Sequence, residues 1–344
     1  MKTVDELSVL ESFDYYERSM SAAISQIPPR LPWVEEDRQA IVQVLCQSLG
    51  VKKEWTPTIE AEVARVLPQD GFAVHFLTFR SWERTYGSAH LYVPDGAESG
   101  GVPLPFVLLC CGHGELSKLT PGYQAVARRL ARQGAYVLIA DNIGQGERVP
   151  MGHRDAVHPF ACGMSVQGLI VMEALAWVEW AKHDARFDNN RLAAVGNSGG
   201  GTLTLMLAAL CDSLAVLSSS GYPSTFEFIA RKEKRHCHCN LIPGIVGQLE
   251  MWQLYSLFAP KPLYLFQGRD DNLIPEDLFY SVVRKVRTAY AKMGAADQFS
   301  FKSIPGPHSW SPESRYRLCA FLAKTLQLAP AADMADDTAD CLDA

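Results

Sequence analysis

Short, continuously apolar segments alternate with helical segments along residues 105–328, and this alternation constrains the fold of the chain most. Residues 106–111 (FVLLCC) and 135–140 (AYVLIA) have the length and unbroken apolar character of buried strands. Further strands are expected at 192–195, 214–218, 263–266 and 299–304, and helices at 124–133, 164–183, 201–210, 276–293 and 313–328. Strands that are apolar on both faces are typical of a parallel sheet covered by helices on both sides. The sequence therefore predicts an α/β fold with a mostly parallel central sheet.

The residues before this alternation form a region of different character. Apolar residues at helical spacing predict an N-terminal helical extension over residues 1–57, which either packs on the sheet or forms a contact between copies of the chain. Residues 73–79 and 88–93 instead alternate between apolar and polar, which predicts two antiparallel strands joined near Gly87. The main domain is therefore expected at 58–328, with antiparallel strands at one edge of its sheet.

Two further segments depart from the regular pattern. Residues 222–259 are too long for an ordinary connection between a strand and a helix, so they form either a lid over a site or an extra structural layer. Residues 329–344 are acidic and rich in alanine, and we expect a disordered tail there.

Composition and charge exclude several classes of protein. A chain of 344 residues with 48% hydrophobic residues can bury a large core. The net charge of −6 argues against a nucleic-acid partner, because phosphate binding needs a basic surface. The chain shows neither a signal-peptide pattern nor an apolar run of the ~18 residues that a membrane span needs. The nine cysteines are an odd number, which favours reduced thiols. We therefore expect a cytoplasmic protein without nucleic-acid or membrane partners.

The strongest catalytic signal is the G-x-S-x-G motif at residues 196–200 (GNSGG). An apolar strand at 191–195 precedes it and an apolar helix at 202–210 follows, which is the strand-turn-helix context of a nucleophile elbow. The outer glycines satisfy the need for small residues two positions from the serine. A phosphate-binding glycine turn is the alternative, but neither G-x-G-x-x-G nor a following Walker lysine is present. We predict that Ser198 is a nucleophile.

A serine nucleophile needs a base to accept its proton and an acid to orient that base. In α/β-hydrolase order, the acid and then the histidine follow the serine. The strand at 263–266 runs into a turn with Asp270 and Asp271, and a Gly-x-x-Asp pattern followed by Pro275 favours Asp271 as the acid. His308 lies in the loop between the last strand and the last helix and is the predicted base.

An oxyanion hole needs two backbone N–H groups that point at the developing negative charge. Gly199, directly after the serine, should supply one of them, and His113 in the glycine-containing loop at 110–114 (CCGHG) should supply the other. Weaker candidates for contacts with the substrate are Gly114, Glu147 and Trp310.

Residues 236–239 (HCHC) suggest a metal site at first sight. Adjacent alternating ligands point to opposite sides of an extended chain, however, and the sequence shows no second ligand pair with zinc spacing. We therefore expect neither a metal nor an organic cofactor.

Several of these segments together carry a family resemblance. They are the loop CGHG at 111–114, where relatives show HGHG, and the segments at 141–148 (DNIGQGER), 163–165, 187–192, 259–263 and the elbow itself. With them, residues 60–328 resemble the α/β-hydrolase superfamily, and within it the acetyl xylan esterase-like and dienelactone hydrolase-like groups. The resemblance implies Ser198, Asp271 and His308 as the triad and suggests a small acyl group such as acetyl. Cys111 departs from the histidine of relatives, which leaves the hydrogen bonds of that loop open.

These observations predict a cofactor-free serine esterase that acts on a small-molecule ester through an acyl-enzyme. The same triad could act on an amide, a lactone or a C–C bond instead. A non-catalytic binding protein on a hydrolase fold is the third alternative, and it requires Ser198 and His308 to lie out of hydrogen-bond reach.

Overall fold

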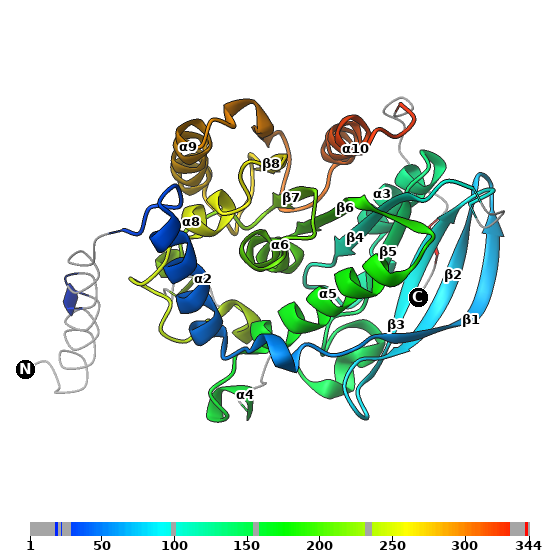
Figure 1. The fold of residues 1–344 in the computed structure, drawn as a ribbon, viewed down its shortest axis with the longest axis horizontal. Coiled ribbons are helices and arrows are strands. Elements are labelled where there is room, and N and C mark those ends of the chain that lie inside the picture. Colours follow the sequence, from blue (N-terminus) through cyan, green and yellow to red (C-terminus); the bar gives the residue numbers. More distant parts are fainter. Residues whose placement is uncertain are drawn as a thin grey trace, which may run out of the picture.

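The computed structural model describes residues 18, 19, 22, 29–97, 101–153, 158–230, 236–330 and 341–342. Its strands are β1 (Glu60–Gln69), β2 (Phe72–Arg80), β3 (Tyr86–Pro94), β4 (Leu104–Cys110), β5 (Tyr136–Ala140), β6 (Phe187–Asn197), β7 (Val216–Ser220), β8 (Leu263–Gly268) and β9 (Phe299–Ile304). They form one nine-stranded sheet in the order β1-β2-β3-β5-β4-β6-β7-β8-β9 (Figure 1).

The helices are α2 (Glu35–Leu49), α3 (Pro121–Arg132), α4 (His158–Ala161), α5 (Val166–His183), α6 (Gly199–Leu210), α7 (Phe226–Ala230), α8 (Met251–Ser256), α9 (Glu276–Lys292) and α10 (Pro312–Leu326). Short 3-10 helices are η1 (Lys53–Trp55), η2 (Ser117–Leu119), η3 (Gly146–Met151), η4 (His238–Asn240) and η5 (Ala296–Gln298). Each strand and helix predicted after residue 105 is present, with ends shifted by a few residues, whereas α4, α7 and α8 were not predicted.

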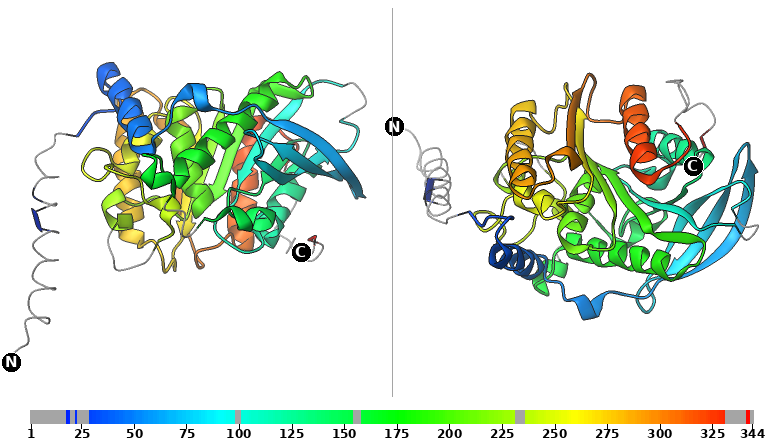
Figure 2. Two further views of the ribbon diagram at one scale, coloured as in Figure 1. Left: turned by 90° about the horizontal axis from the view of Figure 1, so that it is seen from below. Right: turned by 45° about the horizontal axis from the view of Figure 1, so that its top comes forward.

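The direction of strand pairing divides the sheet into two parts. Strands β4 to β9 pair in parallel with one another, whereas β1, β2 and β3 pair antiparallel, and β3 joins the parallel part through an antiparallel pairing with β5. The antiparallel strands lie at one end of the twisted sheet and β8 and β9 at the other (Figure 2). After β4 the chain places β5 on one side and β6 on the other, so the loops after β4 and β6 meet at a topological switch point.

Two buried clusters, one on each face, hold the sheet between layers of helices. Along β4, Leu108 and Cys110 belong to the cluster that includes α2, α5, α6, α8 and α9. Val107 and Leu109 belong to the cluster that includes α3 and α10. Because neighbouring strand residues point to opposite faces, a strand buried on both sides must be apolar throughout. The predicted α/β fold, with a mostly parallel sheet, helices on both faces and antiparallel edge strands, is confirmed.

The antiparallel end differs from the prediction in two ways. Strand β1 was not expected, and most of its side chains are exposed. The turn between β2 and β3 lies at residues 81–85, where Ser81 N–H donates to Thr85 O at 3.0 Å. Gly87 lies inside β3, where a Cβ atom would come within 2.5 Å of the Phe79 ring. Gly87 therefore permits close packing rather than a turn.

The described part of the N-terminal extension packs on the domain. Helix α2 buries Ile41, Leu45 and Leu49 in the core, and Arg38 donates to Leu257 O at 2.9 Å. The predicted helix within residues 1–28 lies mostly outside the described residues. A contact between copies of the chain stays a prediction.

The insertion at 222–259 contributes to the core where it is described. Helix α8 is buried along its length, and Ile245 and Leu249 join the same cluster. Residues 231–235 lie outside the described part, and a lid or an extra structural layer over 222–259 stays a prediction. In the acidic tail, residues 331–340, 343 and 344 lie outside it too, whereas Leu342 N–H donates to Gln124 Oε1 at 2.7 Å.

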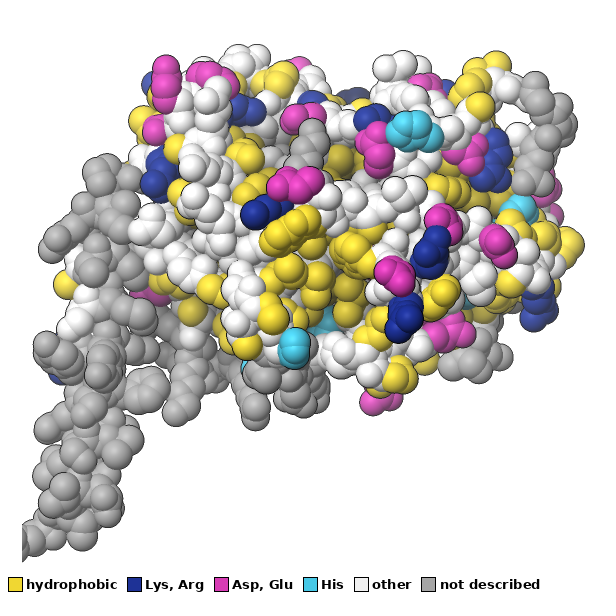
Figure 3. Space-filling view, turned by 60° about the horizontal axis from the view of Figure 1, so that its bottom comes forward, with side chains coloured by type: hydrophobic (Ala, Val, Ile, Leu, Met, Phe, Trp, Pro, Cys, Tyr) yellow, Lys and Arg dark blue, Asp and Glu magenta, His cyan; other side chains and the backbone are white. Residues whose placement is uncertain are grey.

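The surface carries charges of both signs. On the face shown in Figure 3, apolar side chains gather in the middle, and Lys and Arg lie among Asp and Glu around them. No described helix combines the length and the apolar character needed to cross a lipid bilayer.

Candidate active site

The predicted nucleophile lies on a strained turn between β6 and α6. Ser198 has a φ of 58° and a ψ of −119°, a conformation that non-glycine residues rarely adopt. A Cβ atom on Gly196 would overlap Gly200 O, and one on Gly200 would overlap Cys110 O. The two glycines therefore let β6, the turn and the end of β4 approach closely. This is the local geometry that a nucleophile elbow requires.

The predicted acid and base form a direct pair. His308 Nδ1 lies 2.7 Å from Asp271 Oδ2, and because a carboxylate only accepts, Nδ1 carries the proton. The Asp271 side chain is fully buried, and its Oδ1 accepts the N–H groups of Leu273 at 2.8 Å and Ile274 at 3.0 Å. These bonds fix the carboxylate toward the imidazole.

The alternative acid, Asp270, has a different partner. Its Oδ2 accepts the N–H of Gly306 at 3.1 Å, and its own N–H donates to Gly306 O at 2.9 Å. Asp270 thus ties the loop after β8 to the loop that carries His308, and the structure brings Asp271 to the imidazole.

Ser198 and His308 flank the same glycine at the end of β7. A Cβ atom on Gly221 would lie 3.0 Å from His308 Cε1 and 3.3 Å from Ser198 N. His308 Nε2 is buried and has no hydrogen-bond partner among the described residues. The imidazole thus lies beside the serine without a hydrogen bond to it. In free enzymes such contacts are often long and tighten when substrate binds.

The loop after β4 places two candidate oxyanion donors next to each other. A Cβ atom on Gly199 would lie 3.4 Å from His113 N. The preceding N–H, that of Gly112, is already donated to the Tyr123 hydroxyl at 2.9 Å. Asn142 Nδ2 donates to Cys111 O at 3.2 Å, a bond to the backbone that does not depend on the side chain at position 111. A Cβ atom on Gly114 would meet open space.

Tyr123 was not predicted from the sequence as a site residue. Burial raises the pKa of its hydroxyl, which therefore stays neutral and can accept from Gly112. Its ring packs edge-on against Trp310, with the centroids 5.2 Å apart. A single tyrosine on a helix face gives no sequence signal that separates such a role from core packing.

Trp310 is buried and is linked to the nucleophile elbow through Ser220. Its Nε1–H donates to Ser220 Oγ at 2.8 Å, and Ser220 O accepts the N–H of Ser198 at 3.0 Å. The indole thereby fixes the strand residue that holds the nucleophile. A contact between Trp310 and substrate stays a prediction.

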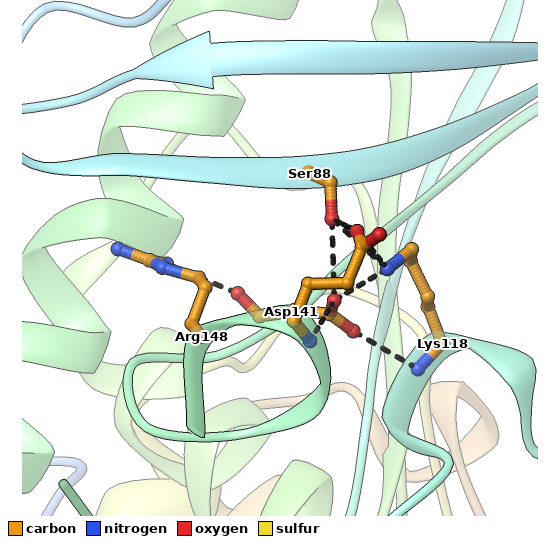
Figure 4. Close-up of polar contacts among 5 residues, drawn as sticks. Ser88, Lys118, Asp141 and Arg148 are labelled. Atoms are coloured by element: carbon orange, nitrogen blue, oxygen red, sulfur yellow. Dashed lines mark hydrogen bonds and ion pairs between the residues drawn. The ribbon is translucent and has the colours of Figure 1, made fainter. Parts of the chain in front are cut away.

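Glu147 forms hydrogen bonds with Ser88 and Lys118 and so joins a polar network. Figure 4 labels four other members of this network: Ser88, Lys118, Asp141 and Arg148. Lys118, with a side chain 4% exposed, binds Asp141, Glu147 at 2.9 Å and Ser88 Oγ at 2.9 Å. The hydrogen bond from Ser88, and then that from Lys118, lower the pKa of the Glu147 carboxyl. Arg148 adds a bond from Nη1 to Asp141 O at 3.0 Å. The network braces the loops after β4 and β5, and a substrate contact by Glu147 stays a prediction.

A second cluster of reactive groups lies beside the oxyanion loop. His113 Nε2 lies 3.1 Å from His153 Nε2 and 2.9 Å from Cys239 Sγ, and Cys237 completes a set of four ligand-type atoms within 4.8 Å of one another. A hydrogen bond with Cys239, and further ones with the two histidines, lower the pKa of the Cys237 thiol. We expected no metal from the sequence because it shows no second ligand pair. In the structure, His113 and His153 lie close to the two cysteines.

Comparisons with known proteins give distant likenesses. No protein-family model matches the chain. A protein of Bacillus subtilis (strain 168) named "Putative hydrolase YtaP" is 23% identical over 200 residues, which cover 57% of this chain and 67% of that protein.

Solved structures share the architecture at low sequence identity. One named "Methylesterase BT1017" aligns with a TM-score of 0.67 and 19% identity, over 88% of this chain but only 65% of that one. A structure from Bacteroides fragilis described as a "putative acetyl xylan esterase" aligns with a TM-score of 0.68 and 15% identity, over 84% of this chain and 81% of that one. Together with the sheet order, these likenesses show that the chain has the α/β-hydrolase fold.

Proposed function

We propose that the chain is a serine hydrolase that cleaves a carboxylic ester through Ser198, His308 and Asp271. The observation that carries the proposal is the strained Ser198 beside an imidazole whose Nδ1 is bound to a buried carboxylate at 2.7 Å. Strain of this kind persists only where the surrounding structure enforces it, and it concentrates at functional sites.

The reaction follows from the positions of protons on the triad. With the proton on Nδ1, His308 Nε2 carries a lone pair and accepts the proton of Ser198 as Oγ attacks the acyl carbon. The N–H groups of Gly199 and His113 stabilise the oxyanion of the tetrahedral intermediate. His308 then gives its proton to the leaving alkoxide, and water releases the acyl group from Ser198 by the same path in reverse.

The ester class is supported by the names of the distant likenesses. A methylesterase and an acetyl xylan esterase both act on esters in which one side of the ester bond is small, a methyl or an acetyl group. We extend this to the present chain and propose an ester with a small group, such as acetyl, on one side.

Steady-state hydrolysis of matched substrates tests this function. We expect p-nitrophenyl acetate to be cleaved faster than longer p-nitrophenyl esters and far faster than the matching acetyl anilide. Ser198→Ala should lower kcat by about 10³-fold or more, because the nucleophile is removed. Ser309→Ala, which alters an exposed serine next to the predicted base, serves as the control and should retain the rate. An unchanged rate in Ser198→Ala would refute the proposal, and a preference for the anilide would redirect it to amides.

A further inference from the structure

We propose that His113, His153, Cys237 and Cys239 bind a zinc ion at the edge of the active site. The four residues come from three segments: the loop after β4, the segment after η3, and the insertion at the start of η4. Metal binding goes beyond the proposed hydrolase function and does not depend on it.

The distances fit a tetrahedral ion. With Zn–N of about 2.0–2.1 Å and Zn–S of about 2.3 Å, ligand atoms of a tetrahedral site lie roughly 3.3–3.8 Å apart. The two imidazole Nε2 atoms lie 3.1 Å apart and His113 Nε2 lies 2.9 Å from Cys239 Sγ. All four ligand atoms lie within 4.8 Å of one another. The two contacts of His113 Nε2 are shorter than these spacings, and the limit for the whole set is about 1 Å longer. Shifts of up to about 1 Å would therefore bring the four atoms into coordination.

The donor atoms select the class of metal. Two imidazoles and two thiols are soft or intermediate ligands that suit zinc, whereas magnesium and calcium prefer oxygen. His153 and Cys239 are buried, at 8% and 2% exposure. Four protein ligands leave no open position for water, so the site is closed and its role is structural.

Outer hydrogen bonds already orient the ligands. Ile143 O can only accept, so the 2.7 Å contact with His153 Nδ1 fixes the proton there and leaves a lone pair on Nε2. This Nε2 contacts both His113 in the cluster and Gln145 Nε2, at 3.3 Å, which a bound ion would displace. Asn240 Nδ2 donates to Cys239 Sγ at 3.5 Å. Such partners on the far side of a ligand are typical of metal sites, because they set the tautomer and the ligand orientation.

The site also connects to the elbow. A Cβ atom on Gly199 would lie 2.6 Å from His113 Cε1, so the imidazole packs directly on the residue after the nucleophile. An ion bound to the His113 side chain would therefore hold the His113 N–H beside that of Gly199. This consequence, unlike metal binding itself, rests on the proposed hydrolase function.

Metal analysis of the purified full chain tests the binding. We expect about one zinc per chain by mass spectrometry of the elements, and a thiolate-to-metal absorption band when Co²⁺ is added to the metal-free protein. Cys239→Ser and Cys237→Ser should each lose most of the zinc and change this band. Cys162→Ser, at an exposed cysteine that is not one of the four ligands, should behave as the unaltered chain.

The Co²⁺ titration uses the unaltered chain, so its result does not depend on whether a variant folds. A folded, reduced chain that takes up neither Zn²⁺ nor Co²⁺ would overturn the proposal. A Cys237–Cys239 disulfide in protein purified under reducing conditions would overturn it as well.

The link to catalysis needs a separate readout. Ser198→Ala should still hold about one zinc, so loss of activity and loss of metal can be told apart. Removal of zinc should lower kcat by about 10-fold or more with a smaller change in KM, because a displaced oxyanion donor weakens binding of the transition state. Full kcat in the metal-free protein would refute the link and leave metal binding intact.

Discussion

Tyr123 and Ser220, which are not proposed to react, fix the backbone at the candidate site. The Tyr123 hydroxyl accepts the N–H of Gly112, one residue before the proposed oxyanion donor His113. Ser220 O accepts the N–H of the nucleophile at 3.0 Å, and Trp310 binds the Ser220 hydroxyl from below. Neither Tyr123 nor Ser220 is proposed to touch the substrate, so both act as positioning residues.

Tyr123→Phe should affect catalysis as well as stability. The substitution leaves the buried N–H of Gly112 without a partner, which costs about 1–3 kcal/mol of unfolding free energy. We expect kcat to fall by about 10-fold with little change in KM, since the loop then holds the His113 N–H less firmly. Urea unfolding and steady-state kinetics measure the two effects.

Tyr290→Phe is the matched control. The Tyr290 hydroxyl donates to Lys261 O at 3.1 Å, outside the candidate site. The Tyr290→Phe variant should be less stable than the unaltered chain but should have the same kcat. Equal kcat values for the two variants would show that Tyr123 is only a packing residue.

The residue scale also shows what the sequence predicts and what it does not. The order serine, acid, histidine and the Gly-x-x-Asp turn led to Asp271 and His308, which the structure brings to 2.7 Å. The sequence points to this pair because each residue lies in a loop that follows a recognisable strand. The sequence contains no such signal for Tyr123, because its role depends on the loop after β4 packing against α3 in the folded protein.

Among elements, buried charge ties β3, β5, η2 and η3 together. Lys118 is 4% exposed and pairs with Asp141, which is fully buried (Figure 4). Lys118 also forms an ion pair with Glu147, whose side chain is more exposed than that of Asp141.

Lys118→Met should destabilise the protein strongly. It leaves the Asp141 carboxylate buried without its cation, which costs about 3–5 kcal/mol in comparable pairs. Arg80→Met removes an exposed pair with Glu60, and because water screens such pairs, the loss should be much smaller. Urea unfolding compares the two, and similar losses would contradict the role of burial.

The cap of α8 should make stability depend on pH. Glu250 begins the helix through a capping box, and burial raises the pKa of its carboxyl to about 7. The folded state therefore binds a proton more tightly than the unfolded state, whose carboxyl titrates near 4.5. Stability from this group is full below pH ~4.5 and is lost as pH rises toward 7, by on the order of 2 kcal/mol.

Glu250→Gln removes this titration. Between pH 5 and 8 the unaltered protein should lose stability relative to Glu250→Gln, which urea unfolding at each pH would measure. Glu62→Gln, on an exposed position of β1, should keep the pH dependence of the unaltered chain. A parallel pH dependence for the chain and Glu250→Gln would refute the assignment.

Prediction of the elements succeeded where burial imposes a pattern. Strands β4 to β8 bury apolar side chains on both faces, so their sequences stand out from the helices between them. Strand β1 is an edge strand with mostly exposed side chains, including Glu60, Glu62 and Arg65. Without a buried face it has no regular alternation, and it was missed for that reason.

At the scale of the whole molecule, the extension and the insertion share the core of the sheet. Leu45 of α2, Leu254 of α8 and Leu138 of β5 belong to one buried cluster. The four proposed zinc ligands also join distant segments, because His113 and Cys239 are 126 positions apart in the sequence. Spacing along the chain could not predict this cluster, because three loops meet only in the folded protein.

A shared core predicts cooperative unfolding. Peptides from α2, α8 and β5 should become exposed to hydrogen exchange at the same urea concentration, as measured by mass spectrometry. Peptides of the sheet that stay protected after α2 or α8 has unfolded would show that the extension or the insertion is an independent unit.

The central claim is that the fold activates Ser198, and covalent labelling tests it most directly. The intact mass of the chain should increase by a single adduct after treatment with a fluorophosphonate, which reacts with activated serines. Ser198→Ala should give no adduct, while Ser309→Ala should react like the unaltered chain. An adduct that persists in Ser198→Ala, or none on the folded chain, would contradict the account.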